Sequence, residues 1–399
     1  MNVRPTEQKA ERIKELCQNM RARKNTTIQK LAELIGKLCS SFPGVELGPL
    51  YYRELERIKC KGLREHRGDF SSTIDITPEA YSELDWWISN VETSHKSIMH
   101  AEPSLIIESD ASKEGWGATV KNGIPTGGRW TREESVLHIN VLELIAAFFG
   151  LKCFCSEMKN QHIRLLLDNS TAVSYINAMG GMKSNMCNKV AKTIWEWCTL
   201  RNLWITACHI PGVTNQAADT ASRAFNDRTE WMIDKIIFEK ITSAFFKPDV
   251  DLFASRINRQ LPNYVSWHAD PEAKFVDAFM LKWTDLSCYL FPPFSLISRC
   301  LQKLALEKVE DALLIVPMWP TQPWFSQLVE TLVEAPLLLP DNILSLPGTK
   351  SQTVQPIKVQ LVACHCSSNQ SRIKEFRKGL PTSSSNHGLK ELRSSTTAS

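Results

Sequence analysis

The chain has 399 residues, of which 43% are hydrophobic and 23% charged, and its formal net charge is +4. This length is too great for one compact core, so we expect about two or three globular domains. The longest apolar run, residues 141–155, contains Glu143 and Lys152 and is shorter than the roughly 20 apolar residues of a membrane helix, so no membrane span is expected.

The twelve cysteines are scattered without a repeated spacing, and the sequence opens with polar residues rather than a signal peptide. We therefore expect reduced thiols in an intracellular protein of the nucleus or cytoplasm. The small positive charge permits binding to nucleic acid but does not by itself indicate it.

Residues 1–98 are predicted to be mainly helical. Residues 7–24 and 27–42 place apolar side chains at helical spacing with basic residues between them, and Pro43 and Gly44 then break the pattern. The basic residues could lie along a phosphate backbone or could form an ordinary solvated helix face, and both interpretations stay open.

Residues 103–225 change to an alternation of strands and helices. We predict strands over 104–110, 115–120, 162–168 and 203–210, and helices over 138–151, 184–200 and 215–225. Hairpin-like strands followed by alternating strands and helices indicate an α/β domain with a mixed sheet.

Four acids occupy matched places in these elements: Asp110 late in the first strand, Glu143 in the first helix, Asp168 at a strand end and Asp219 in the last helix. Brought together at one sheet edge, they would repel each other unless cations neutralised them. Hard oxygen ligands of this kind suit Mg²⁺ or Mn²⁺, and two such ions can promote attack on a phosphodiester. Taken singly, each acid is more often a structural residue, such as a turn residue, a helix cap or a surface residue.

The stretches "SDASKEGWGA", "HINVLELIAA", "LLLDNSTAVSYIN" and "HIPGVTNQAADTASR" resemble motifs of the ribonuclease H domain of retroelement polyproteins. The resemblance implies a ribonuclease H-like mixed five-stranded sheet with helices. It also implies that Asp110, Glu143, Asp168 and Asp219 hold two divalent metal ions and cleave the RNA strand of RNA–DNA hybrids. His209 lies ten residues before Asp219, as a catalytic histidine does in cellular relatives, but "HIPG" could instead match a structural histidine.

The same resemblance assigns contacts with sugar and phosphate to small and polar residues beside the acids. The glycines would let a backbone carrying phosphate approach closely, although a hairpin requirement explains Gly117 equally well. The predicted nucleic-acid-binding residues are Ser112, Gly115, Gly117, Asn169, Ser170, Asn215 and Arg223.

The segments on either side resemble other parts of DIRS-type retrotransposon polyproteins, which carry a tyrosine recombinase. Residues 1–98 are similar to the thumb and connection that follow a reverse-transcriptase palm. No paired-Asp turn of a polymerase occurs in the chain, so a palm domain from the same element is a possible partner.

Residues 248–345 resemble the methyltransferase-like segment of these elements and are predicted to form a smaller α/β domain. Phe291 occupies the position where an adenine N6-methyltransferase has a polar residue, and a phenyl ring cannot accept a hydrogen bond from the target amine. We therefore regard the segment as degenerate and do not expect S-adenosylmethionine to bind. The residues corresponding to its cofactor and base sites are Asp251, Pro292, Pro293 and Phe294.

Residues 348–399 are basic and rich in Ser and Thr, which predicts a flexible tail. "CHC" at Cys364 to Cys366 is not expected to bind metal, because adjacent residues cannot easily share one tetrahedral ion. The sequence thus favours a metal-dependent nuclease acting on RNA–DNA hybrids. An inactive nucleic-acid-binding relic or accessory subunit, and more weakly an adenine methyltransferase, are the alternatives.

Overall fold

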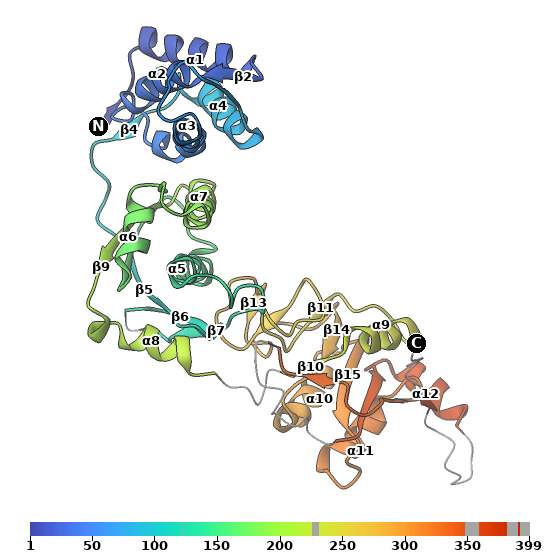
Figure 1. The fold of residues 1–399 in the computed structure, drawn as a ribbon. Coiled ribbons are helices and arrows are strands. Elements are labelled where there is room, and N and C mark those ends of the chain that lie inside the picture. The colour runs from blue at the N-terminus through green and yellow to red at the C-terminus, as the bar shows by residue number, and fades with distance from the viewer. Residues whose placement is uncertain (122, 226–230, 348–358, 381–389, 392–399) are drawn as a thin grey trace.

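The computed structural model describes residues 1–121, 123–225, 231–347, 359–380 and 390–391, and the chain arranges them in three bodies (Figure 1). None of the described helices is both long and apolar enough to cross a bilayer.

The N-terminal body is built from four helices around one apolar core. The side chains of Thr6, Thr27 and Thr77 accept hydrogen bonds from backbone N–H groups in the first turns of the helices that they precede. Two short antiparallel strand pairs, β2 with β3 and β1 with β4, were not predicted. The helices are α1 (Glu7–Arg21), α2 (Ile28–Cys39), α3 (Arg53–Glu65) and α4 (Pro78–Asn90), with a 3-10 turn at Gly48–Leu50. The strands are β1 (Asn2–Val3), β2 (Asn25–Thr27), β3 (Thr73–Asp75) and β4 (Lys96–Ser97).

The middle body contains a five-stranded mixed sheet in the order β7-β6-β5-β8-β9. Strand β5 pairs antiparallel with β6 and parallel with β8, and β8 pairs parallel with β9. The predicted fold class, a mixed five-stranded sheet with helices, is confirmed. The strands are β5 (Leu105–Ala111), β6 (Gly115–Val120), β7 (Thr126–Arg129), β8 (His162–Leu167) and β9 (Trp204–His209).

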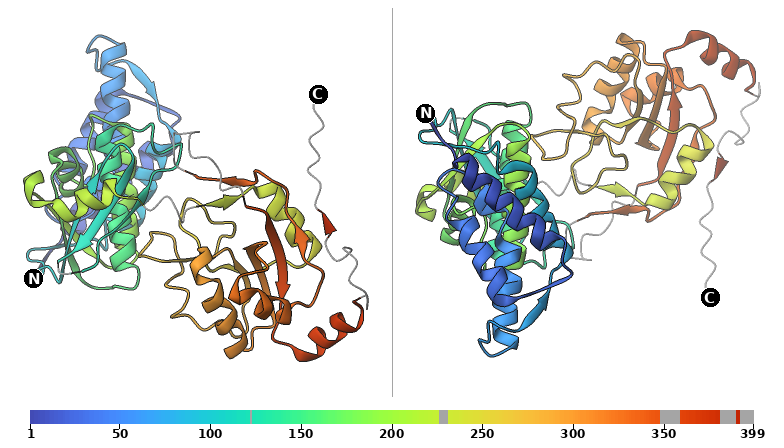
Figure 2. Two further views of the ribbon diagram at one scale, coloured as in Figure 1. Left: turned by 90° about the horizontal axis from the view of Figure 1, so that it is seen from below. Right: turned by 90° about the horizontal axis from the view of Figure 1, so that it is seen from above.

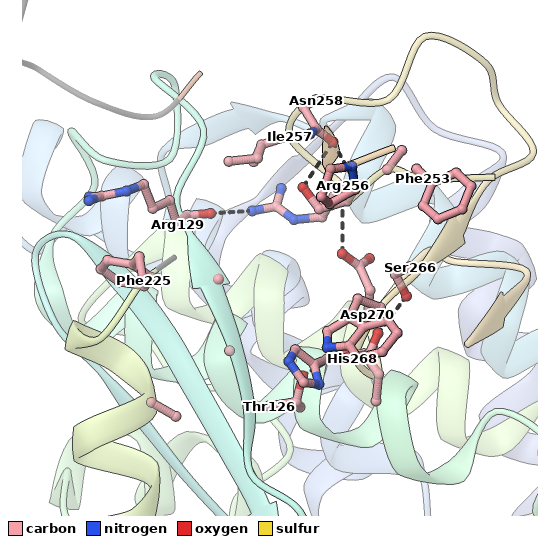
Figure 3. Close-up of a pocket in the computed structure, with 18 of the residues that line it drawn as sticks. Thr126, Arg129, Phe225, Phe253, Arg256, Ile257, Asn258, Ser266, His268 and Asp270 are labelled. Carbon is pink, nitrogen blue, oxygen red and sulfur yellow. Dashed lines mark hydrogen bonds between the residues drawn. The ribbon is translucent and has the colours of Figure 1, made fainter. Parts of the chain in front are cut away.

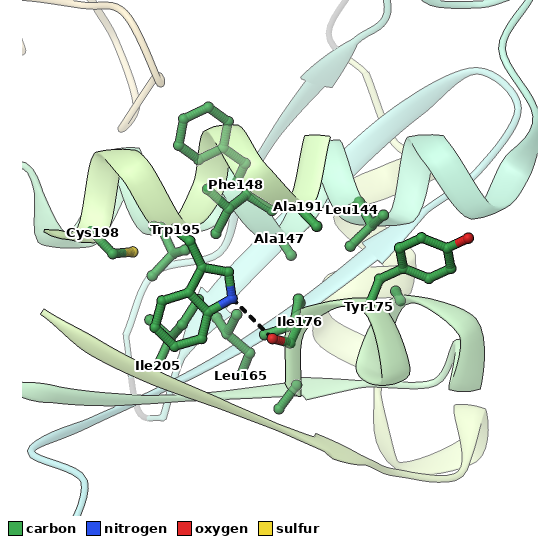
Figure 4. Close-up of a cluster of buried hydrophobic side chains, with 14 of the residues drawn as sticks. Leu144, Ala147, Phe148, Leu165, Tyr175, Ile176, Ala191, Trp195, Cys198 and Ile205 are labelled. Carbon is green, nitrogen blue, oxygen red and sulfur yellow. Dashed lines mark hydrogen bonds between the residues drawn. The ribbon is translucent and has the colours of Figure 1, made fainter. Parts of the chain in front are cut away.

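Helices cover both faces of this sheet (Figure 1). Leu144 and Ala147 of α5, Trp195 of α7, and Leu165 and Ile205 of the sheet share one buried apolar cluster (Figure 4). The opposite face carries α8, which packs against β5, β6 and β7. The helices are α5 (Ile139–Cys155), α6 (Ser170–Asn177), α7 (Asn185–Thr199) and α8 (Gln216–Arg223), with a 3-10 turn at Gly212–Thr214.

The C-terminal body contains a six-stranded sheet in the order β11-β14-β15-β18-β16-β19. Its strands are β11 (Val250–Asp251), β14 (Ser287–Leu290), β15 (Asp311–Pro317), β16 (Leu337–Leu338), β18 (Leu361–Cys366) and β19 (Lys390–Glu391). Short strands pair outside it: β10 (Met232–Ile233) with β17 (Leu344–Ser345), and β12 (Val265–Ser266) with β13 (Phe275–Val276). The helices are α9 (Lys235–Ala244), α10 (Ile297–Leu306), α11 (Pro323–Thr331) and α12 (Gln370–Lys378), with a 3-10 turn at Phe294–Leu296.

The predicted flexible tail is wrong where the structure describes it, because residues 361–366 form the buried strand β18 and residues 370–378 form α12. Strand β18 pairs along its whole length, antiparallel, with Ala312–Pro317 of β15 and carries both Cys364 and Cys366 into the core. His365 lies between these two cysteines in the strand. Its Nδ1 atom is 2.7 Å from Glu334 Oε1, and its Nε2 atom is 2.9 Å from Asp311 Oδ1. The rest of the expected tail, residues 348–358, 381–389 and 392–399, lies outside the described residues.

Both outer bodies lie beside the middle one (Figures 1 and 2), and side chains of each contact it. From the N-terminal body, Arg53 donates to the carbonyl oxygen of Ala178 at 2.8 Å. From the C-terminal body, Arg256 pairs with both carboxylate oxygens of Glu134, at 3.0 and 2.9 Å, and lies over the ring of Phe149. The C-terminal body is therefore fixed to the middle body beside the edge strand β7.

Candidate active site

Three carboxylates converge at one end of the middle sheet. Asp110 is near the end of β5, Asp168 directly follows β8, and Glu143 lies in the second turn of α5. One oxygen from each of the three lies within 4.8 Å of the others. The strand register places Asp110 and Asp168 side by side, because Ser109 pairs with Leu167 in the parallel β5–β8 ladder and these two acids are the next residues.

Burial disfavours the charged forms of these clustered carboxylates. Glu143 is 4% exposed, and its Oε2 atom has no hydrogen-bond partner within the described part of the chain. Burial, and then the neighbouring carboxylates of Asp110 and Asp168, raises the pKa of Glu143 to about 9. Burial also raises the pKa of Asp110, and a hydrogen bond from Ser222 opposes that shift.

These residues fit a divalent cation. Carboxylate oxygens are the ligands that Mg²⁺ and Mn²⁺ prefer, and a buried oxygen without a partner normally costs free energy. A cation beside Asp110, Glu143 and Asp168 would satisfy that oxygen and favour the charged form of all three carboxylates.

The fourth predicted acid stands apart from this trio. Asp219 lies in the first turn of α8 with a side chain that is 44% exposed. Its Oδ1 atom is 2.8 Å from both Nε and Nη2 of Arg223, one turn later in the helix. Its charge still contributes to the raised pKa of Asp110, so Asp219 borders the cluster without joining it.

His209 is exposed at the end of β9, and its Nε2 atom lies 3.1 Å from the backbone carbonyl oxygen of Asp168. The imidazole therefore contacts the backbone of an acidic residue rather than a carboxylate. The next loop also comes close, since a Cβ added to Gly212 would lie 3.2 Å from Asp168 Oδ2. Gly212 lies within the quoted motif "HIPG", but it was not among the predicted site residues.

The small residues beside Asp110 have roles inside the protein. A Cβ at Gly117 would lie 2.2 Å from the carbonyl oxygen of Ala218, and one at Gly115 would lie 2.4 Å from the carbonyl oxygen of Gly128 and from the ring of Phe225. The atoms that require glycine at these positions therefore belong to the protein, including α8, and neither a nucleic acid nor a hairpin is needed to explain them.

The predicted polar contacts divide into buried and exposed groups. Ser112 is 6% exposed and donates to the carbonyl oxygen of Ser222, while Asn215 is fully buried and donates to the carbonyl oxygen of Ser109. Asn169 caps α6 by accepting from Ala172 N. Ser170 and Arg223 are exposed beside the carboxylates, so they remain the accessible members of the predicted set.

A cavity of about 570 Å³ lies between the middle and C-terminal bodies (Figure 3). Its walls include the loop after β11, the turn after β14, strand β7 and the end of α8. Of the methyltransferase-like residues, Pro293 lines it. Asp251 is 1% exposed and accepts from the backbone N–H groups of Phe253 and Gln260, and burial raises its pKa to about 7. Phe294 packs against Trp319 with ring centroids 5.3 Å apart.

Comparison with known proteins gives structural matches only. No protein-family model and no curated protein matches the sequence. RNase H1 of the halophilic archaeon Halobacterium salinarum is 16% identical over 29% of this chain and 91% of its own, with a TM-score of 0.25. LC11-RNase H1 in complex with an RNA/DNA hybrid is 17% identical over 30% of this chain and 93% of its own, with a TM-score of 0.24. The foamy viral protease-reverse transcriptase, also with an RNA/DNA hybrid, is 11% identical over 56% of this chain and 31% of its own, with a TM-score of 0.20.

Proposed function

We propose that this chain is a metal-dependent endoribonuclease that cleaves the RNA strand of RNA–DNA hybrids. The observation that carries the proposal is the convergence of Asp110, Glu143 and Asp168, with an oxygen of Glu143 buried and unpartnered in the described structure. A surface that only binds nucleic acid gains nothing from clustered carboxylates, because they repel phosphate.

In this proposal Asp110, Glu143 and Asp168 hold Mg²⁺ or Mn²⁺, and Asp219 joins them from α8. Divalent ions at such a site supply activation of a water molecule and stabilisation of the leaving oxygen. The three carboxylates fix where the scissile phosphate is received. Arg223 exchanges its contact with Asp219 for a contact with the substrate backbone, which frees the Asp219 carboxylate.

The substrate is read mainly by its shape and by the 2′-hydroxyl groups of its RNA strand, because an A-like groove displays those groups rather than base identity. Ser170 and Arg223, both exposed beside the cluster, are the proposed contacts to sugar and phosphate, and His209 borders the same opening. The biological context that we propose is a DIRS-type retroelement, with a reverse-transcriptase palm as a partner.

The second candidate function is an inactive nucleic-acid-binding subunit of such an element. The Asp219–Arg223 pair favours it, because this contact keeps the fourth acid out of the group. Binding of the hybrid in EDTA, with no cleavage in Mg²⁺ or Mn²⁺, would support this alternative.

The test is cleavage of a labelled RNA–DNA hybrid by the full chain and by Asp110→Asn and Asp168→Asn. We expect each variant to lose more than about 100-fold in rate, since even residues that only support metal ligands typically cost 10–100-fold. Glu108→Gln is the matched control, because it neutralises a carboxylate of β5 that lies outside the trio. A folded wild-type protein that leaves the hybrid intact in both metals would refute the nuclease.

A further inference from the structure

Ser222 links α8 to the carboxylate cluster. It is fully buried, and its Oγ atom lies 2.7 Å from Asp110 Oδ2 and 2.9 Å from the carbonyl oxygen of Asp219. A hydroxyl has one proton and can donate only one of these hydrogen bonds at a time. The carboxylate is the stronger acceptor because it carries charge, so the proton goes to Asp110.

The backbone of Ser222 is held in place independently of its side chain. Ser112 Oγ donates to the carbonyl oxygen of Ser222 at 2.6 Å, and Ser112 itself accepts from the backbone N–H groups of Glu114 and Gly115. Close packing adds to this, because a Cβ at Gly117 would lie 2.6 Å from the backbone nitrogen of Ser222. These contacts hold α8 in one position on the sheet, and from that position the Ser222 hydroxyl reaches the Asp110 carboxylate.

The position of Ser222 in the helix connects two acids. Ser222 is three residues after Asp219, so both lie on one side of α8, about one turn apart. A hydrogen bond from Ser222 to Asp110 thus fixes the orientation of the Asp110 carboxylate. Because it also anchors α8, it sets where Asp219, one turn earlier in that helix, lies relative to the other carboxylates.

We propose that Ser222 is a positioning residue of the metal site: its hydroxyl holds the Asp110 carboxylate in the orientation that binds the cation and sets α8 so that Asp219 can join. This inference rests on the proposed function and deepens it. A residue that only holds α8 in place would affect stability alone, whereas a positioning residue also lowers metal affinity, which an equal loss of stability elsewhere in the chain does not.

The experiment measures Mn²⁺ binding by calorimetry without nucleic acid, together with the unfolding temperature of the metal-free protein. We expect Ser222→Ala to weaken Mn²⁺ binding by about 10-fold, within the range for groups that orient metal ligands. Ser41→Ala is the matched control, because Ser41 is 2% exposed and its Oγ donates to the carbonyl oxygen of Leu38, in the N-terminal body. It should lower the unfolding temperature about as much and leave Mn²⁺ affinity unchanged.

Two further variants distinguish the hydrogen bond from Ser222 to Asp110 from the contacts that hold α8 on the sheet. In an Asp110→Asn background, Ser222→Ala should change Mn²⁺ affinity by less than about 2-fold, because the partner carboxylate is already gone. Ser112→Ala removes the bond to the Ser222 carbonyl oxygen and should lower stability more than it lowers Mn²⁺ affinity.

The outcomes also separate this inference from the nuclease proposal. If Ser222→Ala leaves Mn²⁺ affinity unchanged, or lowers it equally in the Asp110→Asn background, the positioning role is overturned while the nuclease can stand. A wild-type protein that binds Mn²⁺ in a Ser222-dependent way but cleaves no hybrid keeps the positioning role and removes the nuclease. Absence of any Mn²⁺ binding by the wild type overturns both.

Discussion

At the scale of single residues, the candidate site contains a glutamate, Glu143, that is held where its charge is unfavourable. Burial and two neighbouring carboxylates raise the pKa of Glu143 to about 9, so the folded metal-free protein keeps a proton on Glu143 that the unfolded chain releases above roughly pH 4.3. The stability that comes from this group is therefore complete below that pH and is lost as the pH rises toward 9.

Glu143→Gln should consequently stabilise the metal-free protein at pH 8 and abolish hybrid cleavage. A glutamine does not titrate, so the expected gain is on the order of 1 kcal/mol, or about 2–4 °C in unfolding temperature at pH 8. The gain should shrink toward zero as the pH falls to 5 and below, because the unfolded wild-type chain then begins to keep its proton on Glu143, as the folded state already does. Thermal melts in EDTA across this range measure it, and a difference that grows toward low pH would contradict the assignment.

At the scale of elements, the approach of α8 to β6 decides whether Asp219 and Ser222 reach the cluster. Gly117→Ala should push the helix outward, because the new Cβ would meet the Ala218 carbonyl oxygen at 2.2 Å. We expect a loss of about 1–3 kcal/mol in stability, as in other overpacked sites, together with weaker Mn²⁺ binding. Denaturant unfolding and calorimetry measure the two effects.

Gly36→Ala provides the matched control for this substitution. Gly36 lies inside α2, and no atom beyond its neighbours in the helix lies within 4 Å of an added Cβ, so the same change should stabilise the protein by about 1 kcal/mol through helix propensity. If both variants behave alike, the close packing of α8 on β6 does not control the site.

At the scale of the whole molecule, one ion pair joins two bodies. The side chains of Arg256 and Glu134 are 8% and 20% exposed, so breaking their two-point contact leaves a poorly hydrated carboxylate. Arg256→Ala should cost about 3 kcal/mol, toward the low end for a broken buried pair, and should separate the calorimetric transitions of the middle and C-terminal bodies. Arg256→Lys keeps the charge without the planar fork and should recover only part of this loss. An unchanged thermogram for Arg256→Ala would show that the contact does not couple the bodies.

Sequence patterning predicted the elements that bury one regular face. The apolar runs of β5, β8 and β9 and the helical spacing of α7 stand out in any window of the chain. Strand β7, "TGGR", and strand β18, "LVACHC", did not. The first has two glycines with no side chains to alternate, and the second lies in a region whose Ser- and Thr-rich composition indicated disorder.

The sequence by itself determined which residues are candidates for a metal site: four acids at strand ends and in helices, within motifs that resemble those of ribonuclease H domains. Only the tertiary structure decided which of them meet. Asp110, Glu143 and Asp168 converge because α5 and β8 both pack against β5, whereas Asp219 is held by Arg223. Ser112, predicted to touch nucleic acid, is buried and donates to the carbonyl oxygen of Ser222 in α8, and Ser222 contacts Asp110 across 112 residues of chain. Such contacts depend on the packing of segments far apart in sequence, and local propensity and spacing contain no information about it.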